Sequence, residues 1–580
     1  MILKIEVNSV RAVTPSAIYR SLKESVKMLK KSMYAVLSLL VALSLACGGD
    51  DNDSTPAGGN AGAGGEAGAG GEAGEGGAAG EGGEAGEGGE AGEGGEAGEG
   101  GEAGEGGEAG EGGEPACVPG DADTVENLYA FEAWFDGEGS SVSYTGQSGR
   151  QALIGAIKAY IGTLKVTDGV LGGEDAATAA AGVADTLNLL YACTDADGNG
   201  GLCDDEATGV STNPPAKQST IGEISSTNLK GKMAGNDKTG QTVDWNTTGL
   251  AGWGTDAEVT TPEGLLTTWF GMISERATNI ADGTFEQTPA GEDITKAYVS
   301  AQGHDLQQLA QKFLLGAITF NQGADDYTDY DLTDFQGKDL IAEKKGLYGD
   351  NTGLKEGKNY TALEHGWDEG FGYFGAARDY LAYTDDEIAK KGGRENYQGY
   401  HDTNNDCFVD LAAEFNWGHS VNAAKRDRGH STDLTADAFI AFRAGRDIIS
   451  NAAGALTDDE MTALKAHSDA AILAWEKAIA ATVIHYINDT VADIDADEFD
   501  FYTYAKHWSE LKGFGLSFQF NRRSPMTAEQ FAALHAAIGD APALPGQAAY
   551  EDGSFKQGLL DVRAVVGTVY GFDATDVETW

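Results

Sequence analysis

The sequence has little positive charge. Its 580 residues hold 39 Lys and Arg against 92 Asp and Glu, which gives a formal net charge of -53. A protein that binds nucleic acid needs basic groups to neutralise phosphates, so this balance argues against nucleic acid as a partner. The acidity suits solubility outside the cytoplasm, or an affinity for cations in particular loops.

Signatures of catalysis are also missing. The sequence has no HExxH pair for a zinc peptidase, no Ser-His-Asp or Cys-His motif, and no glycine-rich loop that would cradle a phosphate. These absences favour a non-enzymatic protein but leave catalysis open.

The cysteines are few, five in all. Cys47 ends an apolar segment near the N-terminus, and the other four form an even set that suits an oxidising compartment. Three pairings of the four are open. We favour Cys193–Cys203 with Cys117–Cys407, because the first pair brackets one acidic loop.

Residues 1–47 have the form of a bacterial signal peptide. Met28 is a natural start, and a short basic segment and an apolar run too short to span a membrane lead to Cys47. The ending resembles a lipobox, with Ser44 in place of the usual leucine. We therefore expect Cys47 to carry lipid. Because Gly48 rather than aspartate follows, we expect an outer-membrane lipoprotein that faces the periplasm or the cell surface.

Residues 48–116 form a low-complexity linker of Gly, Glu and Ala. Such a segment has no apolar groups to bury and repels itself, so it predicts a disordered, extended tether. Glycine at every third position from Gly83 also meets the rule of a collagen triple helix, but glutamate at the intervening positions disfavours three aligned chains.

Residues 117–580 read as one mostly α domain, an irregular helical bundle with long loops. Gly209–Gly254 has little periodicity and predicts a loop or insertion over the bundle. Leu516–Phe520 is the single strand candidate. Apolar periodicity and capping residues predict helices over Ser148–Leu164, Asp175–Tyr191, Thr261–Ile280, His304–Phe320, Asp458–Asp489, Thr527–Ile538 and Gln557–Tyr570.

A first acidic loop, residues 195–206, has the spacing of an EF-hand calcium loop. Oxygen donors at alternate positions can surround one hard Ca²⁺ ion, and Gly200 permits the sharp turn. A Gly/Asp-rich surface turn is the alternative, and Asn213-Pro-Pro puts the outgoing helix in doubt. The predicted ligands are Asp195, Asp197, Asn199, the carbonyl of Gly201, and Glu206.

A second acidic loop follows the pattern less closely. Cys407 stands where the turn glycine belongs, Ala413 stands where the closing acid belongs, and Glu414 comes one residue late. An Asx-rich structural turn is therefore the alternative to calcium. The predicted calcium ligands are Asp402, Asn404, Asp406, the carbonyl of Phe408, and Asp410.

A third candidate lies in a predicted helix, where His365, Asp368 and Glu369 stand three and four residues apart. Imidazole and carboxylate together suit a transition metal, iron or zinc. The alternative is that His365 is a hydrogen-bonded core histidine among aromatic residues.

Four blocks carry a resemblance to a family: VSYTGQSGRQALI, GHDLQQLAQKFLLGAITF, TALEHGWDEGFGYFGA and EFNWGHSVNAAKRDRG. From Val142 to the C-terminus the chain resembles the DUF4856 domain of bacterial lipoproteins. The resemblance implies a helical, exported lipoprotein, similar to imelysin-like proteins and associated with iron uptake. The imelysin motif Gly-x-His-x-x-Glu is matched only in part, since Leu363 replaces its glycine and Asp368 its glutamate.

Three functions follow as hypotheses. The favoured one is a non-enzymatic, outer-membrane-anchored calcium-binding lipoprotein that serves metal acquisition, iron in particular, alongside other metal-uptake or surface proteins. The alternatives are a metal-dependent hydrolase or peptidase that uses His365 and Glu369, and a surface adhesion module.

Overall fold

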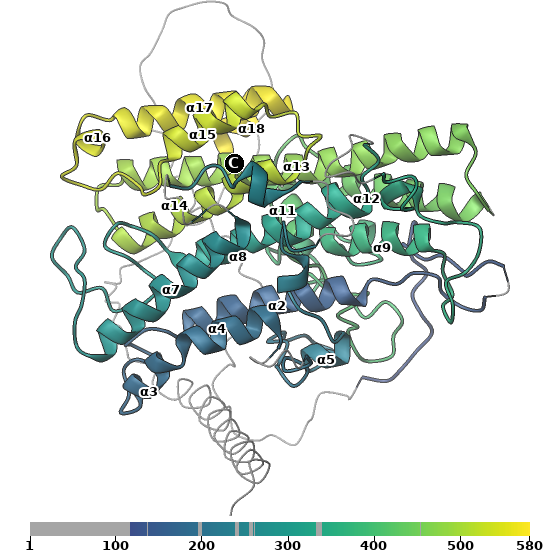
Figure 1. Cartoon of the computed structure of the whole chain (residues 1–580), viewed down its shortest axis with the longest axis horizontal. Helices are drawn as coiled ribbons and strands as arrows, with labels where there is room; N and C mark the ends of the chain where they lie inside the picture. The colour runs from purple at the N-terminus through teal and green to yellow at the C-terminus, as the bar shows by residue number, and fades with distance from the viewer. Residues whose placement is uncertain are drawn as a thin grey trace, which may run out of the picture. The chain divides into compact units, whose positions relative to one another are not determined.

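Helices make up nearly all regular structure in the described part of the chain (Figure 1). The computed structural model describes residues 117–135, 137–194, 200–237, 243–254, 259, 261–331, 339–452 and 454–580, which all fall in one compact unit. Within these ranges extended segments meet only in isolated bridges, and no sheet forms. The prediction of a mostly α bundle is confirmed. The predicted signal peptide, the linker and Cys47 lie outside the described residues.

Two helices begin where local capping signals place them. Thr261 caps α7 (Pro262–Ala281) by accepting the N–H of Gly264 at 3.0 Å, and proline fills the first turn, where its missing N–H costs nothing. Thr527 and Gln530 form a capping box at α15 (Ala528–Ile538). Both starts agree with the sequence.

The centre of the bundle is α13 (Asp458–Asp495), which runs longer than predicted. It packs against α12 (Leu434–Asn451), α14 (Phe501–Gly515) and α17 (Ser554–Tyr570), as Figure 1 shows. In the part that the structure describes, α13 is the one helix long and apolar enough to cross a membrane, and 78% of its apolar window is buried inside the fold. Its apolar residues thus belong to the core of the domain.

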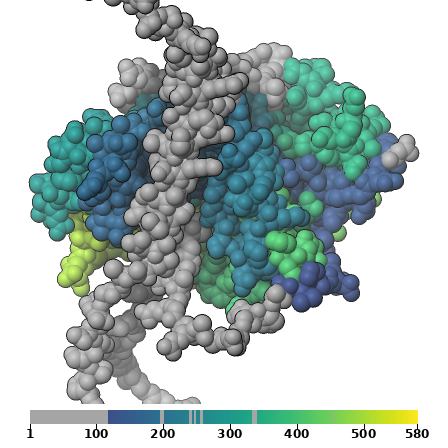
Figure 2. Space-filling view, turned by 90° about the horizontal axis from the view of Figure 1, so that it is seen from below, coloured from purple at the N-terminus to yellow at the C-terminus, as the bar shows by residue number. Residues whose placement is uncertain are grey.

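Residues 145–374 add a second group of helices. In it α2 (Thr145–Gly162) packs on α8 (Leu306–Leu314) and on α9 (Ala362–Phe374). Purple, blue and teal segments form most of the coloured surface seen from below (Figure 2). The remaining helices are α3 (Ala176–Ala181), α4 (Val183–Ala192), α5 (Ile221–Ile224), η1 (Lys230–Lys232), α6 (Trp245–Thr248), η4 (Gly346–Tyr348), η5 (Tyr380–Ala382), α10 (Asp385–Ile388), α11 (Gly418–Asp427), α16 (Ala548–Glu551) and α18 (Ala574–Thr579).

Two predictions need correction. Leu516–Phe520 is not a strand but the 3-10 helix η6, which continues directly from α14. It is buried on nearly all sides, so its apolar residues carry no helical periodicity for the sequence to show. The segment Gly209–Gly254 is also more than a covering loop, because it contains short helices and sends Met233 and Trp245 into the core.

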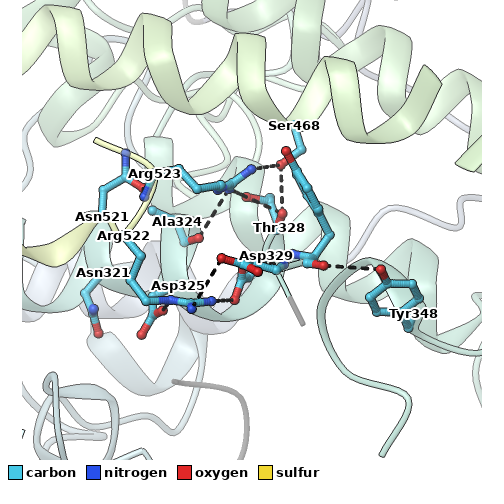
Figure 3. Close-up of polar contacts among 12 residues, drawn as sticks. Asn321, Ala324, Asp325, Thr328, Asp329, Tyr348, Ser468, Asn521, Arg522 and Arg523 are labelled. Carbon is cyan, nitrogen blue, oxygen red and sulfur yellow. Dashed lines mark hydrogen bonds and ion pairs between the residues drawn. The ribbon is translucent and has the colours of Figure 1, made fainter. Parts of the chain in front are cut away.

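Beyond α8 the chain continues in the wider π-helical turns η2 (Leu315–Phe320) and η3 (Gly323–Tyr327), which the sequence did not distinguish from an α-helix. Two arginines fasten the end of η3 (Figure 3). Arg522 donates to Asp325 at 2.9 Å and also to Asp329, and Arg523 donates to Ser468 of α13 at 3.1 Å. The buried carboxylates of this cluster are therefore neutralised within the fold.

Candidate functional site

The two acidic loops each contain one cysteine of a disulfide. Cys193 pairs with Cys203, and Cys117 pairs with Cys407, so the favoured pairing is confirmed. The first bond closes the loop at residues 195–206 across its base. The second ties the start of the folded domain to the middle of the other loop.

Only part of the first acidic loop can be placed. Asp195, Asp197 and Asn199 lie outside the described residues. Gly201 has φ +79°, and Leu202 donates its N–H to the Cys193 carbonyl at 3.3 Å. Helix α4 leads in, although the single helix predicted over Asp175–Tyr191 is split at Gly182 into α3 and α4. After Glu206 the chain runs on without a helix, with Ala207 paired to Thr220. The Cys193–Cys203 disulfide thus ties the second half of the loop to the end of α4, whereas an EF-hand continues there into its second helix.

The second acidic loop is fully described, and its polar side chains fold back on their own backbone. Asp402 accepts the N–H groups of Asp406 (3.1 Å) and Cys407 (2.8 Å). Asn404 accepts from Asp406 at 2.9 Å, and Asp406 accepts from Phe408 at 3.0 Å. These acceptors stand at alternate positions of one turn, and each satisfies a backbone N–H two to five residues further on, as in an Asx-rich turn.

The turn itself survives the loss of its glycine. Cys407, at the expected glycine position, has φ +70°, in the left-handed region that a residue with a Cβ rarely adopts. Its disulfide to Cys117 and its N–H bond to Asp402 hold it there. The glycine-free sequence therefore does not prevent an EF-hand-like bend.

Glu414, which the spacing placed one residue late, nevertheless reaches the loop. Its carboxylate accepts the N–H groups of Thr403 (3.1 Å), Asn404 (3.2 Å) and Asp410 (2.8 Å), and the residue is only 5% exposed. Burial raises its pKa to about 7; the N–H of Asp410 opposes the rise and the charge of Asp402 adds to it. Fixed positional spacing missed Glu414, although an acid one place beyond Ala413 was visible in the sequence.

One segment, residues 207–220, connects the two loops. Its first part pairs Ala207 with Thr220 beside Glu206, and its second pairs Ala216 with Val409 of the second loop. Lys217 from this segment lies 3.6 Å from Asp410, but its side chain is half exposed. A change in one loop thus has a short covalent and hydrogen-bonded route to the other.

The predicted trio on α9 does not stay together. His365 Nε2 lies 3.8 Å from Glu369, and its Nδ1 contacts the Ser143 carbonyl at 3.0 Å. Asp368 is instead fully buried, where it accepts from the Tyr129 hydroxyl and the Arg446 Nε, both at 2.9 Å. The structure thus keeps a His–Glu pair and gives Asp368 an arginine as its partner.

Arg446, from α12, also pairs with Glu364 at 2.8 Å. The side chains of Arg446, Glu364 and Asp368 are all 0% exposed. Burial lowers the pKa of a guanidinium, but Asp368, Tyr129 and Glu364 together outweigh it here and raise the pKa of Arg446. This cluster holds the N-terminal segment to α9 and α12, a structural role. Across the ranges that the structure describes, no three His, Cys, Asp or Glu side chains already stand at metal-binding positions.

These features describe an all-α domain with disulfide-fastened acidic loops. A family model described as Domain of unknown function (DUF4856) matches residues 257–536, so the chain contains a DUF4856 domain there. The match includes the second acidic loop and α9, and it is shorter than the expected resemblance from Val142 onward; the loop at residues 195–206 precedes it. No curated protein and no solved structure matches the chain.

Proposed function

We propose that this protein is a non-enzymatic calcium-binding lipoprotein, anchored to the outer membrane through Cys47. The observation that carries the proposal is the position of Glu414, whose buried carboxylate closes the loop that begins at Asp402. Carboxylates gathered in one turn repel one another, and a bound cation removes that repulsion. Lys217 offsets it weakly, because it is half exposed at the rim.

Calcium suits the donors of this loop. A hard cation takes six to eight oxygens from carboxylates, amides and backbone carbonyls. Asp402, Asn404, Asp406, Asp410 and Glu414 supply side-chain oxygens, and Phe408 supplies its carbonyl. The first loop, with Glu206 as its closing acid, is the second proposed site.

The attachment of the domain supports an anchor on this side. Cys117 is bonded to Cys407, and Gly120 donates its N–H to the Asn405 carbonyl at 3.0 Å. A tether of residues 48–116 would thus join the folded domain beside the second acidic loop. The proposal includes a role in metal acquisition, iron in particular. That role is supported by the resemblance to imelysin-like proteins alone.

The retained pair of His365 and Glu369 favours one alternative, a metal-dependent hydrolase. Asp368 is not available to that pair, because Arg446 and Tyr129 occupy its carboxylate. The hydrolase is therefore the weaker proposal.

Thermal unfolding of the full chain with millimolar calcium and with a chelator tests calcium binding. For a Kd of about 10⁻⁴–10⁻³ M, typical of extracellular sites, 1 mM calcium adds about 0.4–1.4 kcal/mol to the free energy of unfolding. Identical curves in calcium and in chelator would contradict the proposal. Magnesium at the same concentration is the control, since it demands a smaller, more regular shell.

The lipid anchor has a separate test. Mass spectrometry of protein extracted from membranes should find a lipid-modified Cys47 as the first residue. An unmodified thiol at that position would leave calcium binding untouched but remove the anchor.

A further inference from the structure

Two histidines and two aspartates meet where α13 packs on α14. His485 and Asp489 stand one helical turn apart on α13, and His507 and Asp493 come from α14 and the next turn of α13. His485 Nε2 lies 3.2 Å from Asp489 Oδ2, and His507 Nε2 lies 3.9 Å from the same oxygen. The two ring nitrogens therefore converge on one carboxylate oxygen. No sequence motif marked this group, because His507 comes from a different helix than His485 and the two aspartates.

The two distances from Asp489 Oδ2 to the ring nitrogens can be compared with those between donor atoms in a metal shell. Zinc bonds of 2.0–2.1 Å in tetrahedral geometry put neighbouring donor atoms about 3.3 Å apart. The His485 distance of 3.2 Å fits, and the His507 distance of 3.9 Å is longer by about 0.6 Å. A small tilt of the His507 ring closes that difference. The three side chains are thus poised near a metal-binding arrangement without having reached it.

The other side of the His507 ring is already held, since its Nδ1 contacts Asp493 at 2.8 Å. The His485 ring also hydrogen-bonds the backbone of Trp580. A histidine that binds a metal is oriented as His507 is, by an acceptor on the nitrogen opposite the metal. Each of the four side chains is 12–20% exposed, so the group is partly shielded yet reachable from solvent.

Neighbouring charges are mixed. Arg426 and Lys425 of α11 act on His485 and weigh against a cation. Glu510 of α14 is the nearby acid, and Lys312 pairs with it at 3.1 Å. Asp489 and Asp493 together supply two negative charges, which match those of a divalent ion.

We propose that His485, Asp489 and His507 bind a divalent transition-metal ion of the zinc class, with Asp493 as the residue that positions His507. Two imidazoles and one carboxylate select borderline metals such as Zn²⁺ and Co²⁺ over Ca²⁺, which prefers oxygen donors alone. The ion links α13 to α14 and keeps an open fourth position. The site goes beyond the proposed calcium function and lies outside both acidic loops.

Titration of the metal-stripped full chain with Zn²⁺, in saturating calcium to occupy the acidic loops, tests the site. One equivalent of zinc should bind to the wild type. His485→Gln and His507→Gln should abolish this binding, and Asp493→Asn should weaken it by about 10–100-fold, as loss of an orienting partner does. Co²⁺ should give the intense visible absorption of a tetrahedral site in the wild type.

Matched controls locate the ion. His467→Gln, on the same helix, and His365→Gln, on α9, should bind zinc as the wild type does. The proposal is overturned if the wild type binds no zinc, if the histidine variants bind it undiminished with native circular dichroism, or if His365→Gln removes it. Should both histidine variants misfold, the weakened affinity of Asp493→Asn decides, and an unchanged affinity overturns the site.

Discussion

Two of the regions that bury carboxylates neutralise them by different means. Around Arg446, the carboxylates of Glu364 and Asp368 lie within 2.9 Å of a guanidinium that is fully buried with them. In the second acidic loop, Asp402 and Glu414 are almost as buried, but N–H groups hold them and the nearby Lys217 is half exposed. The first region contains its own cation, whereas the second has N–H donors and a half-exposed lysine at its rim.

The difference shows why a carboxylate pattern alone does not identify a metal site. His365, Asp368 and Glu369 have suitable helical spacing, yet an arginine on another helix takes up Asp368. The loop has a defective spacing, yet Glu414 joins it through space. The location of the positive charge decides between a structural ion pair and a ligand site, and that location is a property of the packed fold.

The largest effect is expected when the buried cation is removed. Arg446→Met leaves Glu364 and Asp368 uncompensated in the core, which should lower the free energy of unfolding by about 3–5 kcal/mol. Urea unfolding measures the change. Arg443→Met, on the same helix but in a half-exposed pair with Asp447, should cost less than about 1 kcal/mol. Equal losses for the two variants would mean that burial of the ion pair does not matter.

Without a bound metal, the second acidic loop is expected to make the free energy of unfolding depend on pH. Glu414, whose pKa is raised to about 7, keeps its proton in the folded chain at a pH where the unfolded chain has lost it. Between pH 4.5 and 7 the folded state binds more protons, so the free energy of unfolding falls as the pH rises. At 1.36 kcal/mol per pKa unit, the rise from 4.5 to about 7 sets an upper limit of about 3 kcal/mol.

Comparison with Glu414→Gln isolates the contribution of Glu414 to the pH dependence of stability, because the variant resembles the protonated acid and cannot titrate. In chelator, unfolding of the wild type should be more pH-dependent than unfolding of Glu414→Gln over this range. Millimolar calcium should reduce the difference, since a bound cation favours the ionised carboxylate. Parallel curves in chelator would show that Glu414 titrates normally.

The sequence predicts a structural feature well when the residues that cause it are neighbours in the chain. The starts of α7 and α15 follow from Thr261 and Thr527 with the residues just after them, and the structure confirms both. The π-helical turns η2 and η3, the 3-10 helix η6 and the pairing of Arg446 with Asp368 depend on contacts between distant segments. A single sequence carries no periodic signal for such contacts, so these features appear only in the fold.

The smallest expected effect distinguishes the two acidic loops from each other. Both have a closing acid, Glu206 in the first and Glu414 in the second, and segment 207–220 joins them. Each Glu→Gln change removes one charge while keeping the shape, so each should remove part of the total gain of about 0.4–1.4 kcal/mol from 1 mM calcium. Asp205→Asn is the matched control. Asp205 stands at a position that supplies no ligand in the EF-hand pattern, so the variant should keep the full gain.

If only Glu206→Gln abolishes the shift in melting temperature, calcium binds the disulfide-closed loop alone and Glu414 is a structural acid. If only Glu414→Gln abolishes it, the loop of the DUF4856 domain is the site. A full shift in both variants would place calcium elsewhere and remove the reason for comparing these loops as metal sites.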